Sequence, residues 1–443
     1  MAEKGSWRSG YIVVFVLFVA LLVAYLDRVN ASVLIADTGF LNDMGIANRP
    51  DLRGLVMSVF LWAYGGAALL LSFALDKIGA RRGLVMVALI WSASMFLGGI
   101  AGSFVALILS RLVLGIGEGL QLPVNSMVVK TWAPPRERGM ANSIWGTGLF
   151  VGSAITMPLV AWIVSTMGWR ASFFILGVVP IVIVIPLVLL FVYNRPQESR
   201  WISKTELSYI EEELEAERTS QSATGQGVEV KTEWRKVLTS TDYWLSAITW
   251  MLTTWMFWGL LTWLPSYLKT ERGFTWAQMG GLSALPYLVG TVLLLLSGYL
   301  MFRVRRSTIF MWSGCLAYAI SMSMAVMSKS NLASALWMSL AMGGICWAFG
   351  ASFVVLQKIV PTSVTARATG LWQGIAQISA GFVPYIMGWI IALTSSFTAG
   401  FLFLIIAALL GAVLNFVLFT REGRTFGRII IKTVVASSPA VSE

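Results

Sequence analysis

Long apolar stretches separated by short polar connections occupy most of the chain. Twelve of them are long enough to form helices across a hydrocarbon core about 30 Å thick, which takes roughly 20 residues. With 57% hydrophobic and only 12% charged residues among 443, the chain is too apolar for a soluble domain. We therefore predict an all-α polytopic membrane protein with twelve transmembrane helices, near residues 11–35, 54–75, 83–104, 105–131, 139–164, 171–193, 243–268, 280–301, 307–328, 332–357, 367–393 and 397–420.

One long polar interval, residues 194–242, separates six predicted helices from the other six. We predict an N-terminal six-helix bundle over residues 1–193, a cytoplasmic linker with an amphipathic helix over 194–242, and a C-terminal six-helix bundle with a cytoplasmic tail over 243–443. Ser203 and Glu206 fit the capping box that begins a helix. Charge-rich segments are usually solvated, so we interpret the linker as a connector, with a regulatory docking site as the alternative.

The two halves of the chain repeat weakly. Pro134 precedes Trp145 by eleven residues in the connection between the fourth and fifth helices, and Pro361 precedes Trp372 by eleven between the tenth and eleventh. Matches at corresponding places favour a duplicated bundle with a pseudo-two-fold repeat, which is typical of secondary transporters.

The chain has a net charge of +11, and most of its basic residues lie in loops on one side of the membrane when the loops are assigned alternately. This distribution argues against a nucleic-acid partner. By the positive-inside rule the side richer in arginine and lysine is cytoplasmic, so we expect a plasma (inner) membrane protein with both termini in the cytoplasm. The first apolar segment is too long for a signal peptide, and both cysteines lie within predicted spans, so a disulfide is not expected. The basic side carries Lys4, Arg8, Lys77, Arg81, Arg82, Lys130, Arg136, Arg138, Arg303, Arg305, Arg306, Lys358 and Arg367.

Four charged residues stand inside the predicted spans: Asp27, Arg28, Arg111 and Glu118. A charge at the centre of a bilayer costs about 2.5 to 3.5 kcal/mol even on lenient scales, so such residues usually face each other or a watery cavity. Arg111 and Glu118 are seven positions apart, close to two helical turns, and share one helix face. Asp27 and Arg28 diverge by about 100°, so at most one of them points straight at a central cavity.

Several motifs stand in a specific order. They are AYLDRVN in the first helix, RLVLGIGEGLQLP followed by WAPPRERGMA around the fourth, and LTWLPSYL in the seventh. After the second helix, SFALDKIGARR supplies Asp76, Gly79, Arg81 and Arg82, with Ser72 in place of a first glycine. Over residues 10–420 the chain resembles the major facilitator superfamily, and more narrowly its anion:cation symporter family of sugar-acid permeases and organic-anion carriers.

The resemblance implies roles for the charged residues. The carboxylates matching Asp27 and Glu118 take part in proton coupling, the arginine matching Arg28 holds the substrate carboxylate, and the one matching Arg111 is its cavity partner. It also implies gating by Asp76, Arg81 and Arg82 after the second helix, whereas the second half has Phe302 in place of the acid.

Uncharged candidates complete the expected substrate site. Tyr25 and Tyr64 match cavity tyrosines of related carriers, with simple packing as the alternative. Gln373 and Gln377 lie four apart on one face of the eleventh helix, where the family often has asparagine. Gln121 continues the Arg111 face approximately. Most tryptophans of the seventh helix should face lipid or fill interfaces, but Trp263 lies in the family-like segment and is a candidate for the site or an outer gate.

Charge counting favours an anionic substrate. Two arginines and two carboxylates sum to zero, so an entering monoanion leaves a negative charge that protonation of one carboxylate would cancel. The chain contains no histidine, which leaves these carboxylates as the proton carriers. The competing interpretation is that the four charges only join helices as ion pairs.

Other classes of function have less support. The sequence has no GxxxxGK[ST] loop for an ATP-driven pump and no histidine or cysteine cluster for a metal, and a membrane enzyme or sensor would need parts that are missing. We expect proton-coupled symport of an organic carboxylate by alternating access, most plausibly an aldonate, aldarate or hexuronate, with no cofactor and a monomer as the working unit. Anion exchange or export, and other small carboxylates or sulfonates, are the alternatives.

Overall fold

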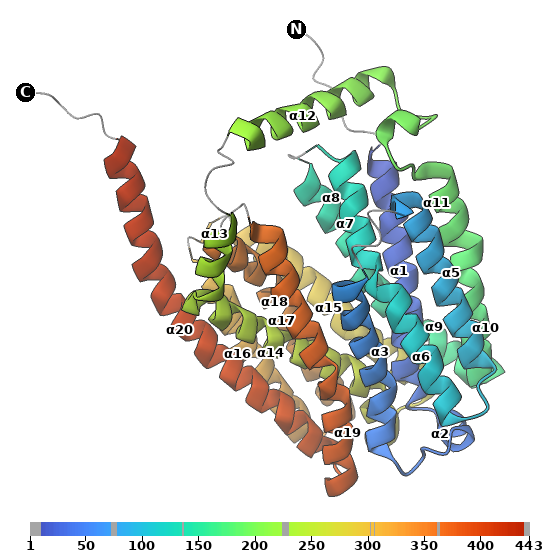
Figure 1. The fold of residues 1–443 in the computed structure, drawn as a ribbon. Helices are drawn as coiled ribbons and strands as arrows, with labels where there is room; N and C mark the ends of the chain where they lie inside the picture. The colour runs from blue at the N-terminus through green and yellow to red at the C-terminus, as the bar shows by residue number, and fades with distance from the viewer. Residues whose placement is uncertain are drawn as a thin grey trace, which may run out of the picture. The chain divides into compact units, whose positions relative to one another are not determined.

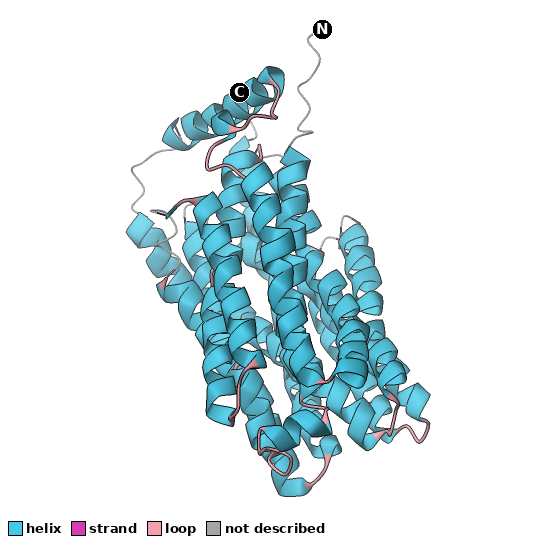
Figure 2. Cartoon of the chain, turned by 90° about the vertical axis from the view of Figure 1, so that its right-hand side faces the viewer, coloured by secondary structure: helices cyan, strands magenta, loops and turns pink. Residues whose placement is uncertain are grey.

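The computed structural model describes residues 10–71, 78–134, 137–223, 230–301, 303–304, 306–360 and 364–437. Within these residues all regular secondary structure is helical (Figure 2). Eleven helical segments of the described chain are long and apolar enough to cross a membrane, and they coincide with eleven of the twelve predicted spans. The all-α polytopic fold predicted from the sequence is confirmed.

The remaining predicted span, the seventh along the chain, is α14 (Thr241–Ser266), a continuous helix of 26 residues. At 1.5 Å per residue it is about 39 Å long, which exceeds the thickness of a hydrocarbon core. Tryptophans and threonines make it less apolar than the other spans. Length and position therefore place it with them, although its composition is mixed.

Four of the predicted spans are interrupted helices rather than single ones (Figure 1). The first half contains α1 (Gly10–Leu34), α2 (Thr38–Asp43), α3 (Pro50–Leu70), α5 (Ala80–Gly99), α6 (Phe104–Gly119), α7 (Gln121–Trp132), α8 (Arg138–Gly146), α9 (Gly148–Met167), α10 (Trp169–Val179), a π-helical turn (Pro180–Val184) and α11 (Ile185–Phe191). A 3₁₀ turn (Pro196–Glu198), α12 (Lys204–Ala223) and α13 (Val230–Leu238) follow. The second half contains α14, a π-helical turn (Tyr267–Glu271), α15 (Trp276–Met301), α16 (Thr308–Met327), α17 (Asn331–Ile359), α18 (Thr365–Ala380), α19 (Phe382–Thr394) and α20 (Phe397–Ser437).

The interruption between α6 and α7 follows Glu118 directly. A Cβ atom added to Gly119 would collide with the backbone carbonyl of Tyr64 on α3. Only glycine lets the two helices approach this closely, because any other residue would carry that Cβ atom. The contact brings the carboxylate-bearing end of α6 against the tyrosine-bearing part of α3.

The chain forms two compact units. Unit 1 comprises residues 1–229, 258–288 and 377–401, and unit 2 comprises residues 230–257, 289–376 and 402–443. Parts of α14, α15 and α18, the whole of α19 and the start of α20 therefore belong to unit 1 together with α1 to α12. The domain limits predicted from the polar interval at 194–242 stay a prediction.

Within unit 1, parts of the second half of the chain pack on the first. The backbone N–H of Tyr385 on α19 donates a hydrogen bond to Ser58 Oγ on α3 at 3.2 Å. The Ser266 hydroxyl on α14 donates to the backbone carbonyl of Ile35, just after α1, at 3.1 Å. Unit 1 is thus closed at the end where α1 ends and α3 begins, which the positive-inside rule predicts to face away from the cytoplasm.

The first part of the predicted linker, which belongs to unit 1, packs against α7 and contacts the start of α1. The Trp201 ring stacks on Trp132 of α7 with centroids 5.5 Å apart, and Ile210 of α12 is fully buried. Ser203 Oγ accepts a hydrogen bond from the Glu206 N–H at 3.2 Å, as a capping box requires. Glu206 reaches the Gly10 N–H at the start of α1 instead of closing the box locally. This part of the linker is a docked element, not only a solvated connector.

A cluster of aromatic rings forms the core of unit 2. Trp250 of α14 stacks on Trp372 of α18 with centroids 4.5 Å apart and an interplanar angle of 10°. Phe349 and Phe353 of α17 meet the Trp250 ring edge-on. Offset and edge-on arrangements of this kind are the favourable ones for aromatic pairs.

A carboxylate from α20 caps the N-terminus of α16 in unit 2. Glu422 accepts hydrogen bonds from the Thr308 N–H at 3.3 Å and the Thr308 hydroxyl at 2.5 Å, and it pairs with Lys358 of α17 at 3.0 Å. A helix N-terminus favours negative charge because its N–H groups and dipole point toward it. In the sequence, Phe302 stands where the first half of the chain has Asp76. The acid at the start of α16 is instead Glu422, which lies 114 residues after Thr308 in the chain.

Substitution of Gly54 by valine should loosen the closed end of unit 1. A Cβ atom there would collide with the Pro384 carbonyl on α19, and overpacking of this kind costs about 1 to 3 kcal/mol. In a Ser58→Cys background, where the position is fully buried, we expect labelling by a membrane-impermeant maleimide to become roughly fivefold faster or more.

Gly66→Val on the same helix is the matched control, because a Cβ atom there meets open space. Labelling of the buried Cys315 and Cys346 in the absence of Ser58→Cys gives the background. Equal rates for the Gly54 and Gly66 variants would show that this contact does not hold the end closed.

Candidate functional site

A buried ion pair between α1 and α6 lies at the centre of the site. Arg28 Nε and Nη2 donate to Glu118 Oε2 at 2.7 and 2.5 Å. The two side chains are 4% and 0% exposed, so the pair is enclosed by protein. Both bonds end on one carboxylate oxygen, and Glu118 Oε1 has no hydrogen-bond partner among the described residues.

Aromatic rings surround the Arg28 guanidinium. Its central carbon lies 4.3 Å from the ring centre of Tyr25, 4.9 Å from Tyr64, 5.3 Å from Phe60 and 5.7 Å from Trp258. A cation over an aromatic face is attracted by the ring quadrupole, more strongly where water is absent. The two tyrosines predicted to line a cavity therefore contact the arginine itself.

Asp27 and Arg111 form the second part of the site. Asp27 is fully buried and Arg111 is 1% exposed. Both carboxylate oxygens of Asp27, and Nε and Nη2 of Arg111, lack hydrogen-bond partners within the described chain. The two side chains interact electrostatically with each other and with Glu118, and Arg111 also lies 5.4 Å from the Phe60 ring centre. Buried charges without hydrogen bonds are rare and call for a functional explanation.

Gln121 bonds within its own helix. Its Nε2 donates to Asn125 Oδ1 one turn later on α7 at 3.0 Å, and both residues are buried. The remaining amide atoms, Gln121 Oε1 and Asn125 Nδ2, have no partner among the described residues. The two amides therefore form a buried polar pair just after the helix interruption, at the start of α7.

The two glutamines of α18 are each held by a tryptophan of α14. In unit 1, Trp258 Nε1 donates to Gln377 Oε1 at 3.0 Å. In unit 2, Trp250 Nε1 donates to Gln373 Oε1 at 2.7 Å. Because Trp258 also contacts Arg28, Gln377 is joined to the ion pair through a single indole. Trp263 instead donates to the Pro384 carbonyl at 3.2 Å and packs against α19.

Three residues at or near the site are not predicted from the sequence. Most tryptophans of this helix are expected to face lipid or fill interfaces, which gives Trp258 no special role, and Phe60 carries no polar signal. Asn30 is fully buried on α1, and both of its amide atoms lack partners in the described structure. Of the three residues, only Asn30 gives a signal in the sequence, because it is a polar residue in an apolar stretch, three positions after Asp27.

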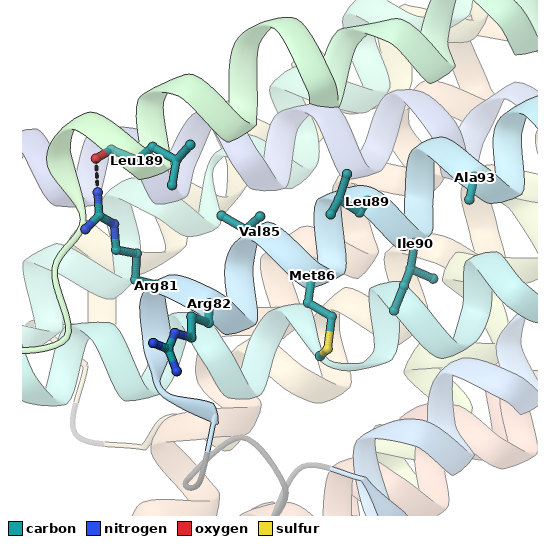
Figure 3. A pocket seen from close by; sticks show the side chains of 8 residues that line it. All are labelled: Arg81, Arg82, Val85, Met86, Leu89, Ile90, Ala93 and Leu189. Carbon is teal, nitrogen blue, oxygen red and sulfur yellow. Dashed lines mark hydrogen bonds between the residues drawn. The ribbon is translucent and has the colours of Figure 1, made fainter.

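Two of the three predicted gating residues, Arg81 and Arg82, lie at the start of α5 (Figure 3). Arg81 donates to the Leu189 carbonyl of α11, its backbone N–H donates to Asn194 Oδ1 at 3.1 Å, and its guanidinium lies 4.9 Å from the Tyr193 ring centre. Arg82 is exposed. Asp76 lies outside the described residues.

Removal of the Glu118 charge should destabilise the protein more than removal of both charges. Glu118→Gln leaves a buried arginine without its counter-ion, which typically costs about 3 to 5 kcal/mol, whereas loss of both partners is far milder. We expect a lowered melting temperature for Glu118→Gln and a substantial recovery for Arg28→Gln/Glu118→Gln. Thermal unfolding in detergent, followed by tryptophan fluorescence, measures both. A double variant no more stable than Glu118→Gln would contradict the pairing.

Comparisons of sequence place the chain among transporters. A family model described as Major Facilitator Superfamily matches residues 17–371. The protein named "Probable sulfoacetate transporter SauU" of Cupriavidus necator is 34% identical over 305 residues, which cover 69% of this chain and 68% of that protein. The "D-galactonate transporter" of Escherichia coli O6:H1 is 28% identical over 437 residues, 95% of this chain and 97% of that protein.

Solved structures share the fold. A bacterial homolog of the human lysosomal transporter Spinster, in an inward-facing conformation, superposes with a TM-score of 0.74 at 17% identity, covering 94% of this chain and 99% of that chain. A D-xylose-proton symporter gives a TM-score of 0.69 at 15% identity, covering 93% of this chain and 97% of that chain. With a family model over most of its length and a fold in common with solved transporters, the chain belongs to the Major Facilitator Superfamily of membrane transporters.

Proposed function

We propose that this transporter carries an organic carboxylate of the sugar-acid class together with protons by alternating access in the plasma (inner) membrane. The observation that supports the proposal best is the buried Arg28–Glu118 pair beside Asp27 and Arg111. Both oxygens of Asp27, and Nε and Nη2 of Arg111, have no hydrogen-bond partner among the described residues, and a purely structural ion pair would not need two such charges next to it. Both termini would lie in the cytoplasm, as the basic loops predict.

The charge balance links the proton to the anion. Arg28 and Arg111 together with Asp27 and Glu118 carry no net charge when all four are ionised. An anion that binds an arginine then adds one negative charge to an enclosed site, where uncompensated charge is expensive. Protonation of Asp27 or Glu118 removes that charge. Substrate and proton therefore favour each other's binding, and the loaded site is again neutral.

Arg28 offers the anion a position already organised for a carboxylate. Its Nε and Nη2 fork now holds Glu118, and a substrate carboxylate would replace that group once Glu118 is protonated. Arginine suits this exchange because its planar fork matches a carboxylate with two parallel hydrogen bonds. Arg111, which has free donors, would hold the anion during the exchange.

The neutral groups around the fork suit a hydroxylated substrate. Tyr25 and Tyr64 bring phenol hydroxyls to the site, and Gln377 has an amide NH₂ group in addition to the oxygen that Trp258 holds. Several donors near one cation match a chain of hydroxyls behind a carboxylate. The relative named as a D-galactonate transporter supports this substrate class.

A sulfonate is the second candidate substrate. It rests on the relative named as a sulfoacetate transporter, which is 34% identical over its matched region. A sulfonate presents three oxygens to the same arginines and fits the same charge balance. Exchange of one anion for another is the alternative mode, and it would leave Asp27 and Glu118 without a role in proton coupling.

Uptake by purified protein in liposomes tests the proposal. With an inward proton gradient and the voltage clamped by potassium and valinomycin, we expect uphill uptake of one class among labelled aldonates, aldarates, hexuronates and sulfonates. Asp27→Asn and Glu118→Gln should abolish this accumulation because they cannot carry the proton. Anion exchange at a rate independent of the proton gradient would overturn the coupling mechanism. Full accumulation by both variants would also overturn it.

Asp43→Asn is the matched control for these variants. Hydrogen bonds from Trp169 and Arg170 lower the pKa of Asp43 from its usual range. A carboxylate with a lowered pKa stays ionised at every pH above that value, including the neutral range of the assay. Asp43 therefore cannot exchange protons during transport, and its asparagine variant should keep gradient-driven accumulation.

Trp258→Phe tests the link between Gln377 and Arg28. Phenylalanine keeps a ring near the guanidinium but loses the N–H bond to Gln377, which is worth about 0.5 to 1.5 kcal/mol. We expect the half-saturating concentration of the transported anion to rise about two- to tenfold with retained proton coupling. Trp255→Phe, whose ring stacks on Phe403, is the control. Equal effects of the two substitutions would remove Gln377 from substrate binding.

A further inference from the structure

An open groove runs along the outer face of α5 in unit 1. Its volume is about 690 Å³, and its walls are Val85, Met86, Leu89, Ile90 and Ala93 of α5 with Leu189 of α11. Figure 3 shows these side chains in a row that begins at Arg81 and Arg82. Leu89 and Leu189 are 50% and 46% exposed. The groove is therefore apolar along its length and cationic at one end.

The two arginines at that end differ in how they are held. Arg81 is fixed by the Leu189 carbonyl and the Tyr193 ring, and its Nε is buried without a hydrogen-bond partner in the described chain. Arg82 is exposed, and no described residue forms a hydrogen bond or ion pair with its guanidinium. One fixed and one exposed guanidinium thus lie at the end of the groove, and none of the described residues that line it is acidic.

The length of the groove matches one leaflet of a bilayer. From Arg82 to Ala93 the helix advances eleven residues, or about 16 Å. Half of a hydrocarbon core is about 15 Å thick. Because Arg81 and Arg82 stand in the first turn of a membrane-spanning helix, they lie at the level of lipid headgroups, while Ala93 lies near the bilayer centre.

We propose that this groove binds an anionic glycerophospholipid of the cytoplasmic leaflet. The phosphodiester pairs with Arg81 and Arg82, aided by the positive end of the α5 dipole. One acyl chain lies along Val85, Leu89 and Ala93. The proposal assigns a second ligand to the transporter and does not depend on the substrate or on proton coupling.

Charge complementarity selects an anionic lipid over a zwitterionic one. A phosphatidylcholine headgroup brings a quaternary ammonium to a site with two guanidiniums and no carboxylate among its described lining residues, so attraction to its phosphate is offset. The apolar walls select a lipid over free phosphate, because an acyl chain packs along them by van der Waals contact and free phosphate has no chain to place there. Both features are needed for the full affinity.

Native mass spectrometry of the purified full-length protein tests the proposal. Phosphatidylglycerol, phosphatidylcholine with the same chains, and glycerol phosphate are titrated separately. We expect one phosphatidylglycerol to bind well above the general background of lipid adducts. Arg81→Gln/Arg82→Gln should weaken that first binding event roughly tenfold to thirtyfold, since each basic group near a membrane surface contributes about a factor of five.

Two further variants separate a built site from general attraction. Arg303→Gln/Arg306→Gln removes two exposed arginines and the same total charge elsewhere, and it should leave the first binding event intact. Ala93→Trp fills the far end of the groove while both arginines remain, and it should also weaken phosphatidylglycerol binding. Equal binding of both lipids, equal losses in the two arginine pairs, or competition by glycerol phosphate would each overturn the proposal.

Discussion

A buried ion pair between Arg28 and Glu118 constrains the whole of unit 1. Two opposite charges inside a membrane protein are tolerable only when their hydrogen bonds are short and their surroundings are closed, because each charge has lost its water. α6 must therefore lie directly against α3, which Gly119 permits, and rings from α1, α3 and α14 must enclose the guanidinium. The two hydrogen bonds from Arg28 to Glu118, 2.7 and 2.5 Å long, thus fix the positions of α1 and α6 relative to each other.

The same site contains charged groups that are hydrogen-bonded and charged groups that are not. Arg28 is committed to Glu118, whereas Asp27, Arg111 and the second oxygen of Glu118 have no hydrogen bonds in the described structure. A fully satisfied network would be rigid, and a fully unsatisfied one would not stay buried. The mixture suits a transporter, since the anion and the proton can exchange partners within a cluster that keeps its total charge low.

Polar contacts at the ends of the helices come from distant parts of the chain. Glu206 of the linker reaches the N-terminus of α1, and Glu422 of α20 caps α16. Arg81 instead donates to the carbonyl of Leu189 on α11. The ends of a helix carry backbone N–H and C=O groups without partners inside the helix. Because this chain has few polar residues, side chains from distant helices form hydrogen bonds with these groups. At the start of α5, Arg81 Nε has no hydrogen-bond partner among the described residues, and Arg82 is exposed.

The sequence alone determined the helical class, the spans and the four intramembrane charges, because apolar length and isolated charge are strong local signals in a membrane protein. It also predicted a substrate site that includes Tyr25, Tyr64, Gln373 and Gln377, and this stays a prediction. Only the tertiary structure decided that Arg28 pairs with Glu118, that Trp258 joins Gln377 to Arg28, and that the linker docks through Trp201. These are contacts between residues separated by up to 119 positions, and helical periodicity says which face a side chain shares but not which helix that face meets.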